Sequence, residues 1–194
     1  GSGNWRMARF LLERKARPEP VGGQPALLAA ARGEDDPAGV MLLLRHKAAV
    51  DARGRLGRSA LMSACLAGNV EIAGALLAAG ADVDARDEHA VTPLLEAARA
   101  GATAVLERLA AARPDAGCRD HSGRSALLVA CQSAQASGAT IAALLNLGVD
   151  PEAAADDGRR PIDVAIASGR WPLVARLDPA YPLPSCHDSA AAET

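Results

Sequence analysis

The sequence predicts an all-α fold, a solenoid in which helix-turn-helix units repeat, stack and are joined by β-hairpin-like loops. Three observations predict it. A short motif recurs at intervals of 33 or 35 residues, a pair of small residues follows each copy, and apolar residues make up 49% of the chain although aromatic residues make up only 2%. A core of Ala, Leu, Val and Ile lets helices approach closely, whereas β-sandwiches normally pack aromatic and β-branched residues.

Five copies of the motif are in register, and repetition at a fixed period is typical of solenoids. The copies are Gln24-Pro25-Ala26, Ser59-Ala60-Leu61, Thr92-Pro93-Leu94, Ser125-Ala126-Leu127 and Arg160-Pro161-Ile162. The three middle copies are 33 residues apart, and each outer copy is 35 residues from its neighbour. The small pairs that follow are Ala29-Ala30, Ala64-Cys65, Ala97-Ala98, Ala130-Cys131 and Ala165-Ile166. We expect these pairs to face the next unit, where only small side chains permit close helix contact.

Each copy is expected to begin a helix. Ser59, Thr92 and Ser125 fall at the N-cap, where a hydroxyl accepts a hydrogen bond from a free backbone N–H group. The next position is the first of the helix, where proline costs no hydrogen bond, and three copies have proline there: Pro25, Pro93 and Pro161. Two residues before each copy a turn with positive φ is expected, at Gly22, Gly57, Gly123 and Gly158, with Ala90 in the remaining copy.

A second helix follows the first in each unit. It is clearest in residues 70–77, where apolar side chains recur at helical spacing, and it ends near Gly80. Residues 81–85 are then expected to be extended and to lead into the next turn. A closing helix is expected over 170–177, with Pro172 in its first turn. Prolines and small polar residues follow it, which predicts a loosely ordered tail over 178–194.

These features resemble the ankyrin-repeat family over residues 3–177. The resemblance is carried by the 33-residue period, the Thr92-Pro93-Leu94 helix start and the Gly80-Ala81-Asp82-Val83 ending. One departure concerns the histidine that usually follows the leucine. It is replaced in the five copies by Leu27, Met62, Leu95, Leu128 and Asp163. Since that histidine implies a hydrogen-bonded link between neighbouring loops, we expect looser loops here.

The array is expected to comprise a partial repeat (3–18), four repeats (19–53, 54–86, 87–119 and 120–154) and a capping repeat (155–177). Gly1-Ser2 is interpreted as a cloning remnant. Residues 3–12 align with 68–77, so the native protein is expected to extend further N-terminally, unless this segment is an unusual cap. Trp5 and Phe10 would cover the exposed end of the stack. The extra residues of repeats one and four fall in segments 33–37 and 133–137. They either contribute to a binding face or result from loop drift.

No catalytic constellation is found. The histidines are scattered: His46, His89, His121 and His187. The segment Cys118-Arg119-Asp120-His121 falls on a loop, and because a zinc site needs four ligands, no metal is expected. Cys65 and Cys131 are expected to be buried, inert thiols. Since a glycine-rich phosphate loop is also missing, we expect no enzyme activity and no cofactor.

Bulk properties narrow the function and location. The formal net charge is -2, so no imbalance favours nucleic acid or an anionic membrane. No apolar run is long enough for a transmembrane helix, and no secretory signal is recognisable. Four cysteines in 194 residues do not form a disulfide framework, which favours a reducing, cytoplasmic location. We expect a monomer, and the high share of Ala, Arg and Gly indicates a GC-rich, bacterial genome.

The resemblance implies a protein-binding module or scaffold, with the partner in a concave groove between the loop tips and the first helices. The partner-binding residues carried over by register are Arg55, Leu56, Arg58, Glu88, His89, Arg99, His121, Arg124, Gln132 and Arg159. Because arginine is enriched at protein interfaces, the expected partner is an extended, partly acidic segment of another protein. The alternative is that these arginines are solvated charges, offset by acids such as Asp87, Glu88 and Asp120.

Two other functions stay open. The array could be the recognition domain of a larger enzyme or secreted effector whose catalytic part lies outside this sequence. Nucleic-acid binding through the arginines is disfavoured, because single Tyr and Phe residues provide few platforms on which bases could stack.

Overall fold

The computed structural model describes residues 13–14 and 24–182, and in this part of the chain every regular element is a helix. The α-helices are α2 (Ala26–Ala31), α3 (Ala38–Arg45), α4 (Ala60–Ala67), α5 (Val70–Ala78), α6 (Pro93–Ala100), α7 (Thr103–Ala111), α8 (Ala126–Gln132), α9 (Gly138–Asn146), α10 (Pro161–Ala167) and α11 (Trp171–Leu177). A short 3-10 helix, η2, spans Arg55–Gly57. Predictions on Trp5, Phe10, Gly22, most of 3–18 and residues 183–194 lie outside the described residues.

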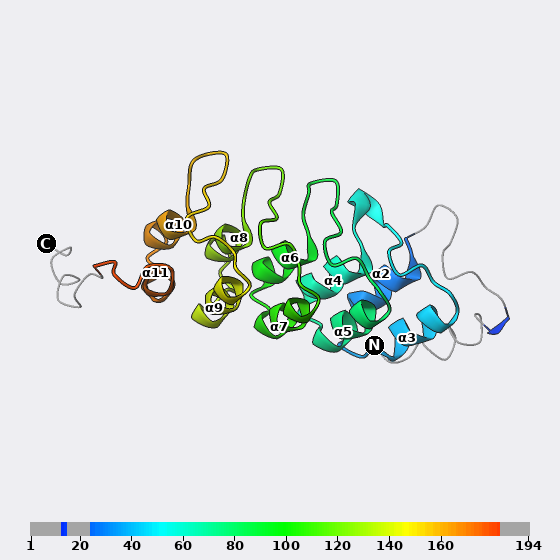
Figure 1. Ribbon diagram of the computed structural model, residues 1–194. Coiled ribbons are helices and arrows are strands. Elements are labelled where there is room, and N and C mark those ends of the chain that lie inside the picture. The colour runs from blue at the N-terminus through cyan, green and yellow to red at the C-terminus, as the bar shows by residue number, and fades with distance from the viewer. Residues whose placement is uncertain (1–12, 15–23, 183–194) are drawn as a thin grey trace, which may run out of the picture.

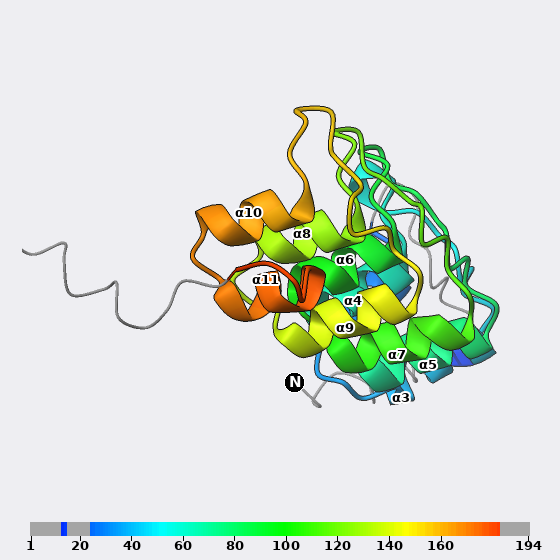
Figure 2. The same cartoon turned by 60° about the vertical axis from the view of Figure 1, so that its left-hand side comes forward.

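The helices form two parallel rows (Figure 1). The inner row contains α2, α4, α6, α8 and α10, and the outer row contains α3, α5, α7, α9 and α11. Long loops join each outer helix to the next inner helix and project beyond the inner row, as Figure 2 also shows. This arrangement confirms the prediction of an all-α solenoid of stacked helix-turn-helix units.

The predicted N-caps are confirmed. The hydroxyls of Ser59, Thr92 and Ser125 accept hydrogen bonds from backbone N–H groups three residues on, at 3.3, 3.3 and 3.4 Å. Pro93 and Pro161 occupy the first helical position, as expected. The prediction for Pro25 is wrong by one residue. Its ψ of 134° is extended, so Pro25 is itself the N-cap and α2 begins at Ala26.

The small pairs of the three middle copies lie in the core, where they let inner helices pack closely. In the first copy the prediction is wrong by one residue, since Ala29 is exposed and Ala30-Ala31 is the buried pair, and in the last copy Ile166 is only half-buried. Ala64, Cys65, Ala97 and Ala98 have no measurable exposure. Burial raises the pKa of the Cys65 thiol far above its usual range, and the charge of Glu96 raises it further. Burial likewise raises the pKa of Cys131 to about 11, against a smaller lowering by a nearby arginine. Thiols that remain protonated are poor nucleophiles, so their structural role is supported.

The projecting loops turn through residues with positive φ. Gly57, Gly123 and Gly158 have φ of 70°, 70° and 79°, as predicted for these turns. Ala90 occupies the equivalent place with φ of 58°, in a region that a side chain with Cβ disfavours. The third repeat therefore makes its turn with a residue less suited to it.

Replacing Ala90 with glycine is expected to stabilise the fold by about 0.5–1 kcal/mol, because relief of the left-handed strain exceeds the added entropy of the unfolded chain. The measurement is urea unfolding followed by circular dichroism. Ala104→Gly, the same substitution on the exposed side of α7, is the control and should cost about 1 kcal/mol. Destabilisation by both substitutions would show that the turn is not strained.

Neighbouring loop tips are joined although the family's histidine is missing. A backbone N–H of each tip donates to a carbonyl of the preceding one, from Glu88 to Leu56 at 3.0 Å and from His121 to His89 at 3.0 Å. The guanidinium of Arg119 adds a hydrogen bond to the carbonyl of Ala154 in the next loop, at 2.6 Å. The expectation of loosened loops is therefore corrected, since backbone and arginine donors provide links between the repeats.

The lengthened loop of repeat one, residues 33–37, contributes a helix cap to the next repeat. The Asp35 carboxylate accepts hydrogen bonds from the N–H groups of Glu71 and Ile72, at 3.0 and 3.1 Å. These groups belong to the first turn of α5, whose own N-cap Asn69 provides no side-chain hydrogen bond. Asp35 thus caps a helix of the neighbouring repeat. This contact explains the insertion better than loop drift or a place on the binding face.

Asp35→Ala is expected to cost about 1 kcal/mol of stability, the usual effect of removing an N-cap acceptor. Asp35→Asn should retain most of the stability, because asparagine is an equally good cap. Thermal or urea unfolding of the three proteins provides the comparison. An asparagine variant as unstable as the alanine variant would indicate that capping is not what Asp35 contributes.

Candidate binding surface

A pocket lies between the tips of the third and fourth loops and the inner helices. It has a volume of about 320 Å³ and is lined by Arg58, Asp87, His89, Val91, Glu96, Arg99, Asp120, His121, Ser122 and Arg124. A second depression, of about 390 Å³, adjoins it and is lined by Arg99, Arg124, Val129, Gln132 and Ser133. Arg99 and Arg124 line both, so the two form one surface, which we call the arginine groove.

The arginine groove brings together six of the ten residues predicted to bind a partner. These are Arg58, His89, Arg99, His121, Arg124 and Gln132. The other four lie outside its walls on loop tips: Arg55, Leu56, Glu88 and Arg159. Of these, Arg159 is paired with Asp157 at 2.5 Å on the last loop. The predicted surface is thus contiguous in repeats three and four.

The histidines reach the groove because an aspartate shapes each loop tip. Asp87 Oδ1 accepts hydrogen bonds from the N–H groups of His89 and Val91, at 2.8 and 2.9 Å. Asp120 Oδ1 forms the same turn in the next repeat, with the N–H groups of Ser122 and Arg124 at 2.9 and 3.0 Å. Asp favours such turns because its side chain can hydrogen-bond the backbone two residues on. Both aspartates therefore have structural roles.

Arg58 differs from its predicted role as an exposed contact. Its side chain is only 16% exposed, and Nη1 lies 2.7 Å from Glu96 Oε1 and 3.9 Å from Asp87 Oδ2. Glu96 belongs to the inner helix of the next repeat, and its carboxylate also lies 3.5 Å from Arg99 Nη1. The prediction for Arg58 is therefore corrected: its side chain neutralises a buried acid and joins two repeats.

Sequence reasoning missed Glu96, although a signal was available. Its equivalents 33 residues away are Ser63 and Val129, which are buried in their own repeats. A glutamate in this register must be covered by the stack, and a buried carboxylate needs a cation nearby. The register alone could therefore have predicted a buried ion pair.

Arg124 is fixed but retains an accessible face. Its Nη2 lies 2.6 Å from Asp120 Oδ2, and Nη1 donates to Gln132 Oε1 at 3.3 Å. Burial alone would raise the pKa of Asp120, but hydrogen bonds from the side chain and backbone of Arg124 and from the Ser122 N–H group hold it below its usual value. Asp120 thus stays ionised and holds the guanidinium in the groove wall.

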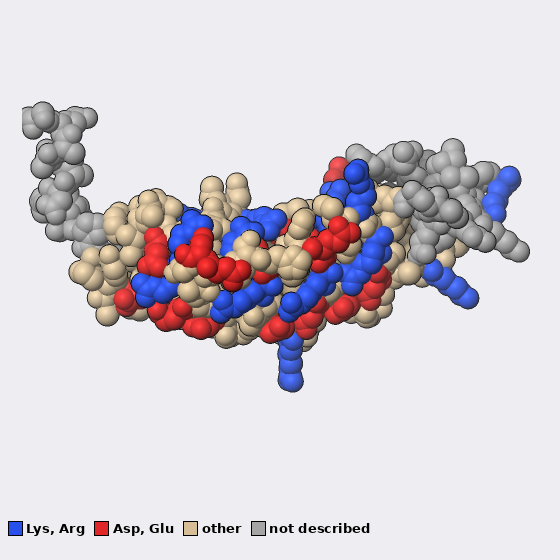
Figure 3. Space-filling view, turned by 90° about the horizontal axis from the view of Figure 1, so that it is seen from above, with Lys and Arg blue, Asp and Glu red and all other residues tan. Residues whose placement is uncertain are grey.

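The groove contains equal numbers of arginines and acids, but they differ in exposure. The side chains of Asp87, Glu96 and Asp120 are at most 3% exposed. Those of Arg99 and Arg124 are 41% and 34% exposed. A molecule that enters the groove therefore meets guanidinium donors first. Viewed from above the loops, both signs of charge alternate along the surface, without one large basic patch (Figure 3).

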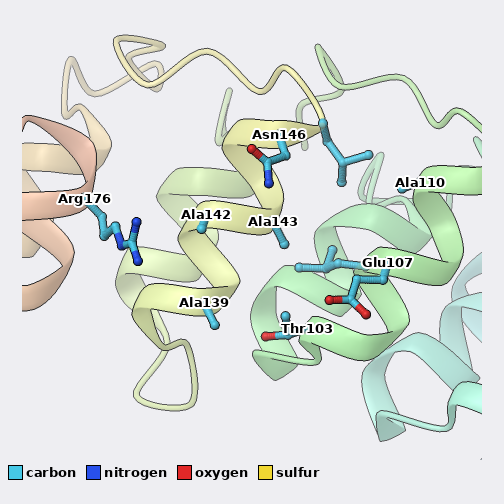
Figure 4. Close-up of a pocket in the computed structure, with 10 residues that line it drawn as sticks. Thr103, Glu107, Ala110, Ala139, Ala142, Ala143, Asn146 and Arg176 are labelled. Carbon is cyan, nitrogen blue, oxygen red and sulfur yellow. The ribbon is translucent and has the colours of Figure 1, made fainter.

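A different pocket lies on the outer row, and sequence reasoning did not anticipate it. It has a volume of about 510 Å³, and its wall is formed mainly by α7 and α9 with Arg176 from α11 at one end (Figure 4). Alanines dominate its surface, at positions 110, 139, 142 and 143. Glu107 and Arg176 stand at opposite sides. This trough offers small apolar contacts and few polar groups.

The described residues contain no cluster of three or more His, Cys, Asp or Glu side chains placed to hold a metal ion. Nor do they include a helix with the length and apolarity required to span a bilayer.

Comparison with known proteins supports the resemblance to ankyrin repeats. The family model for ankyrin repeats (3 copies) matches residues 2–87, and the same helix pairs continue beyond the matched part to Leu177. The match supports the assignment of this chain to the ankyrin repeats, which its sequence resembles. Ankyrin repeats generally mediate protein–protein interactions and are typically non-catalytic binding modules. The curated proteins include none that matches this chain.

Proposed function

We propose that this protein is an interaction module that holds an extended, partly acidic segment of another protein in the arginine groove, across repeats two to four. The observation that supports it is the contrast in exposure between Arg99 and Arg124 and the acids behind them. Arginine offers several planar donors, which suit carboxylates and main-chain carbonyls. Electrostatic complementarity of this kind increases specificity and association rate.

The test must change the groove's charge while keeping the closest ion pair of each buried acid. Removing the Arg99 guanidinium ends its 3.5 Å contact with Glu96 but leaves Glu96 paired with Arg58 at 2.7 Å. Arg58 and Arg124 are unsuitable targets, because each neutralises a buried acid. The double variant Arg99→Gln, Gln132→Glu removes one exposed cation and adds one anion, while a glutamate at 132 can still accept from Arg124. The same pair of changes elsewhere, Arg108→Gln with Gln135→Glu, provides a matched control, since both residues are exposed and lie outside the groove.

Each protein is immobilised and exposed to lysate of the source cell, and captured proteins are identified by mass spectrometry. We expect a partner that the wild type and the Arg108 control capture equally and that the groove variant loses by about tenfold or more, corresponding to about 1.4 kcal/mol. Circular dichroism first establishes equal helicity. Equal capture by all three proteins would contradict the proposed site. Capture of nucleic acid instead of protein would contradict the proposed partner class.

A further inference from the structure

The arginine groove has an apolar counterpart one repeat earlier. Leu56 and Leu66 precede His89 and Arg99 by 33 residues each, and those two residues line the groove. Leu56 lies at the tip of the second loop and Leu66 near the end of α4, so both belong to the same face. The face therefore changes from apolar to basic between the second repeat and the third.

Both leucines are unusually accessible. Their exposed fractions are 51% for Leu56 and 41% for Leu66, and Met41 on the outer row is the other large apolar side chain exposed to this degree in the described part of the chain. Leu56 also has φ of 59° and ψ of 24°, a left-handed conformation that is rare outside glycine and asparagine. Its carbonyl accepts from Glu88 at 3.0 Å, which fixes this tip against the next. A strained, exposed leucine at a loop tip indicates a contact residue.

The spacing of the two surfaces limits the conformation of a segment that contacts both. Packed helices are about 8–10 Å apart, so equivalent positions in adjacent repeats are separated by about that distance. In a β-strand, side chains on one face recur about every 6.8 Å, or at about twice that distance. In polyproline II conformation, residues three apart share a face and are about 9.3 Å apart. Of these two conformations, polyproline II has the side-chain spacing that lies within the 8–10 Å (about one repeat) between equivalent positions.

We propose that the face recognises a polyproline II segment of another protein, in which an apolar residue over Leu56 and Leu66 is three positions from an acidic residue over Arg99, which is one repeat further on. The inference rests on the proposed function and adds the spacing and conformation of the ligand. Exposed donors at one end and exposed apolar surface at the other provide the complementarity. A polyproline II segment is already ordered when free, so it loses little entropy on binding.

The probe is a set of fluorescein-labelled synthetic peptides, each containing one Leu and one Glu separated by one, two, three or four prolines, in both chain orders. Fluorescence anisotropy gives Kd for each. We expect one order to bind most tightly with two intervening prolines, by about fivefold over one or three. Leu56→Asn, Leu66→Gln and, separately, Arg99→Gln, Gln132→Glu should abolish this optimum. Met41→Gln, which removes the exposed apolar side chain of the outer row, should leave it intact.

Equal Kd values at all spacings, or an optimum that survives both groove variants, would overturn the inference. The capture experiment separates this result from a failure of the proposed function. A natural partner lost by the groove variant, together with a flat peptide series, overturns only the spacing. Equal Kd values at all spacings, together with no partner that depends on the groove, overturn both the spacing and the proposed function.

Discussion

Arg58→Glu is expected to destabilise the fold by about 3–5 kcal/mol, the usual range when one partner of a buried ion pair is removed. The substitution would place a second carboxylate beside Glu96, whose side chain has no measurable exposure and lies 2.7 Å from the native guanidinium. Arg99, 3.5 Å from the other oxygen of Glu96, is too exposed to neutralise both acids. The measurement is the free energy of unfolding in urea.

Two controls separate charge from position. Arg55→Glu reverses a charge three residues earlier, on an exposed side chain of the same loop, and should change stability by less than about 0.5 kcal/mol. The double variant Arg58→Leu, Glu96→Leu removes both charges and should retain most of the stability, because no charge is left buried alone. An Arg58→Glu variant as stable as Arg55→Glu would contradict the assignment of Arg58 to a structural pair.

Arg170→Ala is expected to cost about 2–4 kcal/mol, because several carbonyls lose a charged donor at once. The Arg170 guanidinium donates to the carbonyls of Cys131 near the end of α8 and of Ser133 and Ala136 in the lengthened loop of repeat four. In a solenoid each repeat is stabilised mainly by its neighbours. The loss should therefore be concentrated in the capping helices α10 and α11.

Hydrogen exchange resolved along the chain provides the measurement. Amides of α10 and α11 should exchange faster in Arg170→Ala, while those of α4 and α6 change little. Arg176→Ala, on the exposed side of α11, is the control and should leave the exchange pattern unchanged. Uniform acceleration along the whole array would show that Arg170 does not act through the capping repeat.

The sequence predicted the helix starts well because local rules determine them. A hydroxyl at the N-cap followed by proline requires no tertiary context, and Thr92-Pro93 behaves as expected. Pro25 is the exception: it lacks a hydroxyl residue before it, and the helix begins one residue later. The glycine turns followed from the same local reasoning, including the less favourable Ala90.

Contacts between repeats were harder to predict, since the 33-residue register gives the place of a residue but not its partner. Arg58 is in register with Arg124, yet Arg58 is covered by Glu96 of the next repeat, whereas Arg124 retains an open face. The caps provided by Asp35 and the bonds from Arg170 likewise join residues more than thirty positions apart. Such pairs depend on the side chain opposite, which only the three-dimensional arrangement specifies.

The central claim is that a protein partner lies in the arginine groove, and hydrogen–deuterium exchange of the protein with and without its captured partner tests it most directly. We predict slower exchange on binding in the loop tips 87–92 and 120–125 and at the ends of α6 and α8. Exchange in α7 and α9 should be unchanged. Protection confined to α7 and α9, around the outer trough, would contradict the claim and place the partner on the opposite face.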